Sequence, residues 1–253
     1  MSQRLYDGWV VDLKVKRLLS PETSTSVRSY IDEVELSVGE CLPLEQHPEE
    51  RLFYFLYGRG IMSIYEEFPE GDVYELNQDT AIWITPKIKH QIMNTGNYPL
   101  RYVVLMVTGG VAPEGELSWS AITQRGVVVD KPQVGAGQAT TRVFDEGSNP
   151  SKQEGFHLRI RDINLRRPQK FANAEAVTIS PGKSTRIHTH HDSEENYYIL
   201  VGEGAFIWDD KEITCEAGSC ISFPVGVSRK VVNTGRYPLT YVCFSAFIDA
   251  RAP

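Results

Sequence analysis

The feature that most constrains this chain is a repeat of its own sequence. Residues 94–103 read NTGNYPLRYV and residues 233–242 read NTGRYPLTYV, so eight of ten positions agree at an offset of 139 residues. Upstream, two glycine pairs repeat in the same order: Gly58 and Gly60, Gly202 and Gly204. Sequence repeats of this kind fold as copies of one structural unit, so we expect two similar domains, over 1–150 and 151–253.

Each copy consists of short apolar stretches separated by turn residues. In the second copy these stretches are 177–179, 196–201, 205–208, 220–223 and 241–248. Glycine, proline and aspartate stand between them, and no stretch of about ten residues has helical periodicity. Short strands with turn signals every 8–12 residues or so are typical of an all-β sandwich or barrel.

The segment between the copies, 113–154, is rich in Gly, Pro and Ser, which predicts a linker with loops. Two short stretches inside it, 126–130 and 142–144, are expected to be strands that pair across the two barrels. Near the N-terminus, 14–19 is expected to be a short helix. The domain boundary is placed near residue 150.

Charge and cysteine usage narrow the class of protein. The formal net charge is −7, which argues against nucleic acid or an anionic membrane as the partner, because both require a basic surface. No apolar run reaches the length of a membrane span, and the N-terminal residues lack the apolar core of a secretion signal. The four cysteines form no C-x-x-C pair, which favours reduced thiols in a cytoplasmic protein: Cys41, Cys215, Cys220 and Cys243.

A cluster of histidines and carboxylates stands at the start of the second copy. Side chains alternate along a strand, so His188 and His190 point to the same side. Glu194 and Glu195 follow after a short turn, and the returning strand brings one of these carboxylates beside the two imidazoles. Two imidazoles and a carboxylate suit a divalent transition metal such as Fe, Mn, Ni or Zn. The alternative is a pair of surface histidines on a polar strand.

These residues give the segment a resemblance to the cupin superfamily. Its first signature, G-x5-H-x-H-x3–4-E-x6-G, is matched at Gly182, His188, His190, Glu195 and Gly202. Its second, G-x5-P-x-G-x2-H-x3-N, is matched at Gly218, Pro224, Gly226 and Asn233, but the histidine position holds Arg229. With the repeat, the resemblance implies a bicupin: two jelly-roll (double-stranded β-helix) barrels in tandem. It also implies a metal in the C-terminal barrel, held by His188, His190 and Glu195, and a possible homodimer.

Arg229 leaves three interpretations open. A guanidinium has no acceptor lone pair and cannot replace the missing histidine ligand. In the favoured interpretation a three-ligand metal site remains and Arg229 binds a substrate carboxylate or phosphate through its bidentate fork. In the second, the metal site is weak or lost and the barrel only binds a small molecule. In the third, Arg229 points outward as a solvated residue at the rim.

The first copy retains a different part of the motif. Aligned on the repeat, Glu45, His47 and His90 form a possible second metal site, while Arg51 stands where the second copy has Glu195. The alternative is a barrel kept for structure and packing.

The expected function is that of a metal-dependent enzyme acting on a small organic anion in the C-terminal barrel. Arg229 is expected to orient the substrate, and Glu194 to serve as an outer-shell group or general base. Aromatic side chains that point inward are candidates for the wall of the substrate pocket: Tyr198, Phe206, Trp208 and Phe223. The alternative, favoured for most of the aromatic residues, is core packing alone. A dioxygenase-like reaction is favoured, because three protein ligands leave coordination positions open. The alternatives are a metal-assisted isomerase or dehydratase of a sugar or keto acid, and a non-catalytic small-molecule-binding bicupin.

Overall fold

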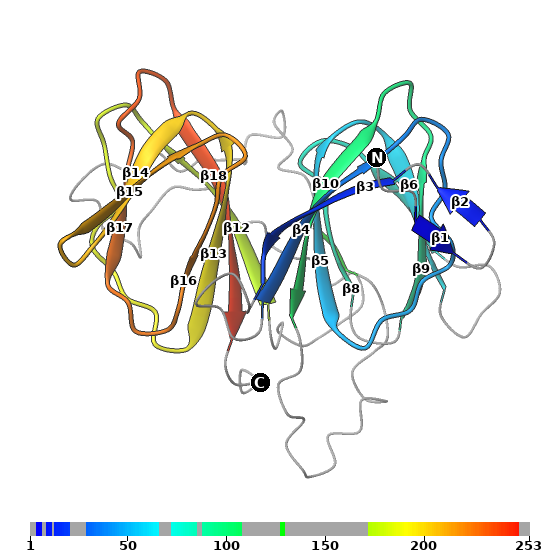
Figure 1. Cartoon of the computed structure of the whole chain (residues 1–253), viewed down its shortest axis with the longest axis horizontal. Helices are drawn as coiled ribbons and strands as arrows, with labels where there is room; N and C mark the ends of the chain where they lie inside the picture. The colour runs from blue at the N-terminus through cyan, green and yellow to red at the C-terminus, as the bar shows by residue number, and fades with distance from the viewer. Residues whose placement is uncertain are drawn as a thin grey trace, which may run out of the picture.

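The computed structural model describes residues 4–6, 9–11, 13–20, 29–65, 72–84, 88–107, 127–129 and 172–247. Every regular element in these ranges is a β-strand. They contain no helix with the length and apolar character needed to cross a membrane. The strands form two barrels that stand side by side (Figure 1).

The N-terminal barrel is built from one large and one small sheet, preceded by a short hairpin of β1 (Arg4–Tyr6) and β2 (Trp9–Val11). The large sheet has the order β11-β8-β5-β10-β4-β3. Its strands are β3 (Leu13–Leu19), β4 (Ser29–Leu36), β5 (Glu50–Tyr57), β8 (Ala81–Ile84), β10 (Leu100–Val107) and β11 (Val127–Val129). The small sheet, in the order β7-β6-β9, contains β6 (Gly60–Tyr65), β7 (Asp72–Leu76) and β9 (Lys89–Asn94).

The C-terminal barrel repeats this plan. Its large sheet, in the order β12-β18-β13-β16, contains β12 (Ala172–Ile179), β13 (Ser193–Val201), β16 (Cys220–Phe223) and β18 (Leu239–Phe247). Its small sheet, in the order β15-β14-β17, contains β14 (Glu203–Trp208), β15 (Lys211–Glu216) and β17 (Arg229–Val232). The expected all-β fold of two tandem jelly-roll barrels is therefore confirmed.

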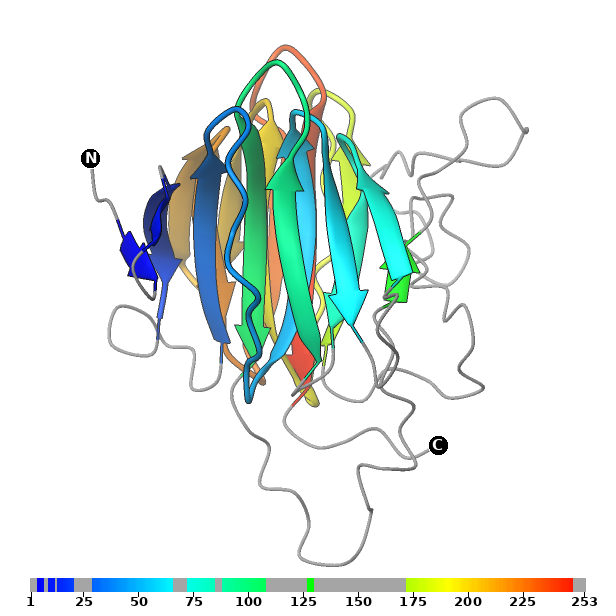
Figure 2. The same ribbon diagram turned by 90° about the vertical axis from the view of Figure 1, so that its right-hand side faces the viewer.

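The large sheets are apolar on both faces. Inside each barrel, side chains from its two sheets meet in a core, exemplified by Ile199, Phe206 and Leu239 in the C-terminal barrel. The opposite faces of the two large sheets share a third apolar cluster, in which Tyr54 and Leu105 of the N-terminal barrel join Phe244 of the C-terminal one. Figure 2 shows the N-terminal barrel, coloured blue to green, in front of the C-terminal barrel, coloured yellow to red. The barrels therefore pack back to back through their large sheets.

Two local expectations are wrong. Residues 14–19 belong to strand β3, which pairs antiparallel with β4, because a neighbouring strand supplies the backbone partners that a short helix would have to make internally. Strand β11 pairs with β8 inside the N-terminal barrel and not across the two barrels. Residues 142–144 and the boundary near residue 150 lie outside the described residues.

The repeated NTG sequence closes the same turn in each barrel. The amide of Asn233 donates to the carbonyls of Ile179 (2.7 Å) and Tyr237 (2.8 Å), and its oxygen accepts from the Gly235 backbone at 2.9 Å. Asn94 makes the equivalent bonds in the N-terminal barrel. A buried side chain that satisfies three backbone groups explains why this part of the repeat is so similar.

The repeated glycines are required by the backbone conformation and by close contact with a neighbouring segment. Gly58 and Gly202 have φ of 93° and 89°, in the left-handed region, and a Cβ at either would lie 2.5 Å from the carbonyl oxygen of Pro99 or Pro238. Only glycine fits such a close approach of two backbones.

We expect Asn233→Ala to lower the free energy of unfolding by about 2–4 kcal/mol, because buried backbone groups lose their partners. Chemical denaturation measures this change. The control is Thr234→Ala, a change at the exposed neighbour, which should stay within about 0.5 kcal/mol of wild type. Equal effects of the two substitutions would contradict the role given to Asn233.

Candidate metal centres

Each barrel carries four side chains at equivalent positions around its interior. Backbone bridges pair Glu45 with His90 and His188 with Arg229, which aligns the two sets in three dimensions. The sets are Glu45, His47, Arg51 and His90 in the N-terminal barrel, and His188, His190, Glu195 and Arg229 in the C-terminal one. Each therefore holds two histidines, one glutamate and one arginine, but the glutamate and the arginine occupy different corners.

Both predicted sets of metal ligands come together. The donor atoms of His188, His190 and Glu195 lie within 4.8 Å of one another, and so do those of the N-terminal set: Glu45, His47 and His90. The sequence thus identifies two clusters that have the donor types and the spacing of a transition-metal site.

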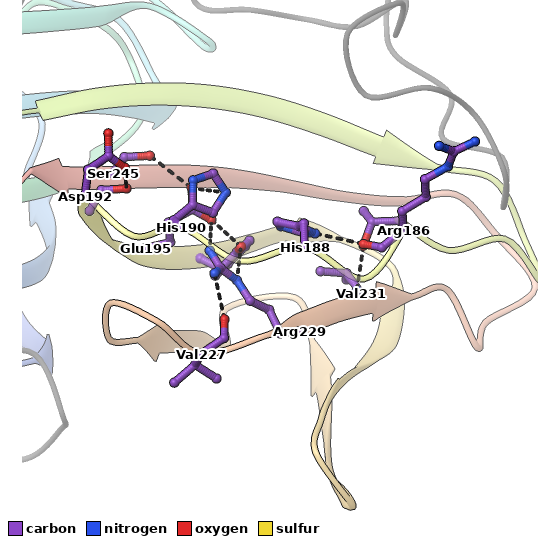
Figure 3. Close-up of polar contacts among 12 residues, drawn as sticks. Arg186, His188, His190, Asp192, Glu195, Val227, Arg229, Val231 and Ser245 are labelled. Atoms are coloured by element: carbon purple, nitrogen blue, oxygen red, sulfur yellow. Dashed lines mark hydrogen bonds and ion pairs between the residues drawn. The ribbon is translucent and has the colours of Figure 1, made fainter.

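The C-terminal cluster already contains a cation. Figure 3 shows His190, Glu195 and Arg229 pointing toward one another, with His188 beside them. A guanidinium nitrogen of Arg229 forms an ion pair with Glu195 Oε2, and His190 Nε2 lies 3.1 Å from Oε1 of the same carboxylate. Burial alone raises the pKa of Glu195, but Arg229 and His190 overcome this effect and hold that pKa below its usual value. The carboxylate is therefore charged and compensated.

Both oxygens of Glu195 are in use. Oε2 accepts from Arg229 and from the Tyr197 hydroxyl, and Oε1 accepts from the Ser245 hydroxyl at 3.3 Å and contacts His190. Burial, and next the charge of Glu195, raise the pKa of Tyr197, so its hydroxyl stays protonated as a donor. A metal ion at this cluster would have to displace these partners.

Arg229 is a buried structural side chain. It is 1% exposed, so the interpretation in which it is a solvated rim residue is wrong. Its Nη1 donates to the Val227 carbonyl (3.0 Å), its Nε to the Tyr197 hydroxyl (3.3 Å) and its Nη2 to Glu195. The favoured interpretation, in which Arg229 binds a substrate anion through its bidentate fork, stays a prediction; in this structure one edge of the guanidinium is held by Tyr197 and Glu195.

The N-terminal cluster presents a free nitrogen. His90 is 1% exposed, and its Nε2 has no hydrogen-bond partner among the described residues. Its Nδ1 lies 3.2 Å from the Ile88 carbonyl and donates to it, which leaves the lone pair on Nε2. Burial lowers the pKa of His90 to about 4, so the ring is neutral near pH 7. A buried, neutral, unpartnered imidazole nitrogen is suited to bind a metal ion.

The arginine of the N-terminal cluster has its own counter-charge. Arg51 forms an ion pair with Glu49, through Nη2 at 2.5 Å and Nε at 3.1 Å. Glu45 contacts His47 at 3.3 Å, and no ion pair joins Glu45 to Arg51 among the described side chains. Burial raises the pKa of Glu45, but the hydrogen bond and the charge of His47 outweigh it and lower that pKa overall. The ligand carboxylate is charged and is not held by arginine.

Two residues expected at the C-terminal site lie on the opposite face of β13. Glu194 is buried between the barrels, where it accepts a hydrogen bond from Ser29 at 3.2 Å, and Tyr198 belongs to the apolar cluster that the two barrels share. The role of Glu194 as an outer-shell group or base at this metal site, and of Tyr198 in its pocket, is therefore wrong. Strand alternation is the reason, since Glu195 points inward and its neighbours at odd spacing cannot.

The other aromatic residues do face the barrel interior. Phe206 and Phe223 are buried in the C-terminal core, and Trp208 packs against it. The guanidinium of Arg229 lies over the Phe223 ring, 5.7 Å from its centre. Two residues of these clusters were not predicted from the sequence: Tyr197, which supports the Glu195–Arg229 pair, and Glu49, which neutralises Arg51. The sequence does contain a signal for Tyr197: it stands two residues after Glu195, so the two side chains point to the same face of the strand.

Comparisons with known proteins agree with this architecture. The cupin domain family model matches residues 32–107 and 176–245, which together are more than half of the chain. An uncharacterised protein of Methanocaldococcus jannaschii is 35% identical over 89 residues, covering 34% of this chain and 70% of that protein. An oxalate-binding protein of Thermotoga maritima is 29% identical over 101 residues, covering 40% of this chain and 81% of that protein.

Solved structures share the fold at low identity. A glyoxylate-induced protein of Pseudomonas aeruginosa has a TM-score of 0.69 at 14% identity, covering 96% of this chain and 84% of that one. A mutant oxalate decarboxylase of Bacillus subtilis has a TM-score of 0.65 at 15% identity, covering 100% of this chain and 76% of that one. With a family match in each barrel, this chain belongs to the cupin family and contains two cupin domains.

Proposed function

We propose that the chain binds a small organic anion through a divalent transition metal held in its N-terminal barrel by Glu45, His47 and His90. The observation that carries this proposal is the Nε2 atom of His90, which is buried and has no hydrogen-bond partner in the part of the chain that the structure describes. Leaving such an atom unpaired costs about 1–3 kcal/mol, and a bound metal ion would remove that cost.

The donor set fits such an ion. Two imidazoles and one carboxylate lie within 4.8 Å of one another, which is the ligand combination that Fe, Mn, Ni or Zn accept with open positions for water or ligand. The hydrogen bond from His90 to the Ile88 carbonyl fixes the ring and its tautomer, as outer-shell bonds do at metal sites. When bound, the metal would supply a Lewis acid.

The charge balance favours an anionic ligand. Arg51 and Glu49 neutralise each other, so Glu45 is the remaining charge of the cluster. With a dication the cluster would have a net charge of about +1, which attracts an anion to the open coordination positions. A related protein is named for binding oxalate and a structural neighbour for decarboxylating it. We therefore propose small carboxylates of the oxalate class as ligands.

The sequence favoured a metal in the C-terminal barrel, whereas the proposed metal lies in the N-terminal barrel. In the C-terminal cluster the carboxylate is already paired with Arg229, whereas Glu45 is not paired with an arginine. The reaction classes expected from the sequence, dioxygenase-like chemistry foremost, stay predictions, because a fold and a donor set do not specify a reaction.

Glu45→Gln/His47→Gln should abolish metal uptake. Wild-type protein incubated with Mn²⁺ or Zn²⁺ and then desalted should retain about one equivalent per chain, as a specific site of this kind does. The matched control, His188→Gln/His190→Gln, alters the equivalent corners of the other barrel and should leave uptake unchanged. Elemental analysis provides the readout. Metal that disappears from the control variant and persists in Glu45→Gln/His47→Gln would overturn the assignment.

Oxalate should bind only to metal-loaded protein. We expect isothermal titration calorimetry to detect oxalate binding to the Mn²⁺-loaded chain, with an affinity at least about tenfold weaker after chelation. Oxamide, which has a similar shape without the charges, is the matched ligand and should not bind measurably. Equal binding of oxalate to loaded and chelated protein would contradict a metal-mediated site.

A further inference from the structure

We propose that the guanidinium of Arg229 takes the place of a metal ion in the C-terminal barrel and thereby prevents metal binding there. This inference does not require the N-terminal cluster to hold metal, because it rests on the C-terminal residues alone. It identifies Arg229 as the residue that keeps a metal out of the C-terminal barrel.

The guanidinium of Arg229 is almost fully enclosed, and each of its nitrogens has a hydrogen-bond partner. Arg229 is 1% exposed, and each of its three nitrogens donates to an acceptor of the barrel interior: the Glu195 carboxylate, the Tyr197 hydroxyl and the Val227 carbonyl. The ring of Phe223 lies against it at 5.7 Å. A buried arginine with this many partners is built into the site.

The residue that supports Arg229 also differs between the two barrels. Tyr197 stands two residues after Glu195 and supplies a hydroxyl that contacts both Glu195 and Arg229. The equivalent residue of the N-terminal barrel is Phe53, two residues after Arg51, which has no hydroxyl and packs edge-on against His90 at 5.6 Å. The tyrosine is found in the barrel with the buried arginine, and the phenylalanine in the barrel with the unpartnered imidazole.

A metal at this cluster would also lack a free carboxylate and would be repelled by a neighbouring cation. Both Glu195 oxygens are occupied, by Arg229 and Tyr197 on one side and by Ser245 and His190 on the other. A dication placed among the donor atoms would lie close to the guanidinium of Arg229, which is itself 1% exposed. Because Arg229 and Glu195 are buried, solvent and salt screen this repulsion less than they would between surface charges.

It follows that the C-terminal barrel has a cation that chelators cannot remove. Its Glu195 is compensated by Arg229 without any metal ion. Together with the proposed N-terminal site, the exchange of His90 for Arg229 at one corner would separate a metal-dependent barrel from a metal-independent one within a single chain.

The test is whether histidine at position 229 creates a metal site. All variants are made in the full chain with Glu45→Gln/His47→Gln, which removes two N-terminal donors and isolates the C-terminal barrel. In this background we expect less than about 0.1 equivalent of bound Zn²⁺ or Mn²⁺, rising to about one equivalent when Arg229→His is added, since four ligands are then available. Elemental analysis after desalting measures both values.

Arg229→Lys is the matched control, because it keeps a cation and supplies no metal ligand at neutral pH; it should remain below about 0.1 equivalent. Far-ultraviolet circular dichroism and thermal unfolding identify any variant that fails to fold, and Arg229→His/Tyr197→Phe, which copies the N-terminal pair of residues, then replaces it. Metal bound in the background chain would show that Arg229 does not exclude it. If neither histidine variant binds metal once it is folded, the proposal is also wrong. Neither result depends on whether the wild-type N-terminal barrel binds metal.

Discussion

The alternation of side chains along β13 is the constraint on which the rest of the structure depends. Glu195 and Tyr197 point into the C-terminal barrel, while Glu194 and Tyr198 point toward the other barrel. One strand therefore builds a polar cluster on one face and the apolar contact between the barrels on the other. A shift of β13 by one residue would exchange the two sets and separate Glu195 from Arg229, so this register is strongly fixed.

The repeat made the fold predictable, because its most similar residues are those that close the turns. Asn94 and Asn233 satisfy buried backbone groups, and Gly58 and Gly202 adopt φ values near 90°. These requirements are local and visible in sequence. By contrast, the helix predicted over 14–19 is wrong because the pairing of this segment with β4 depends on residues 12 to 21 positions away, and local patterns do not contain such information.

The site was predictable as a set of donors but not as a set of charges. Spacing alone brings His188, His190 and Glu195 together. Which anion each arginine pairs with depends on three-dimensional geometry: Arg51 finds Glu49, two residues away, whereas Arg229 finds Glu195, on another strand. Because of that difference Glu45, rather than Glu195, is the carboxylate that is not paired with an arginine. This is why the proposed metal site lies in the N-terminal barrel, although the sequence favoured the C-terminal one.

Both barrels start from the same four side chains, and burial decides what each set can do. A buried charge is tolerated only when it is paired, so Glu195 and Arg229 form a neutral unit that has no need of an ion. In the N-terminal barrel the buried member is instead the neutral ring of His90, whose Nε2 has no hydrogen-bond partner among the described residues. The metal ion proposed for this barrel would supply that partner without burying an unpaired charge, because Glu45 belongs to the same cluster.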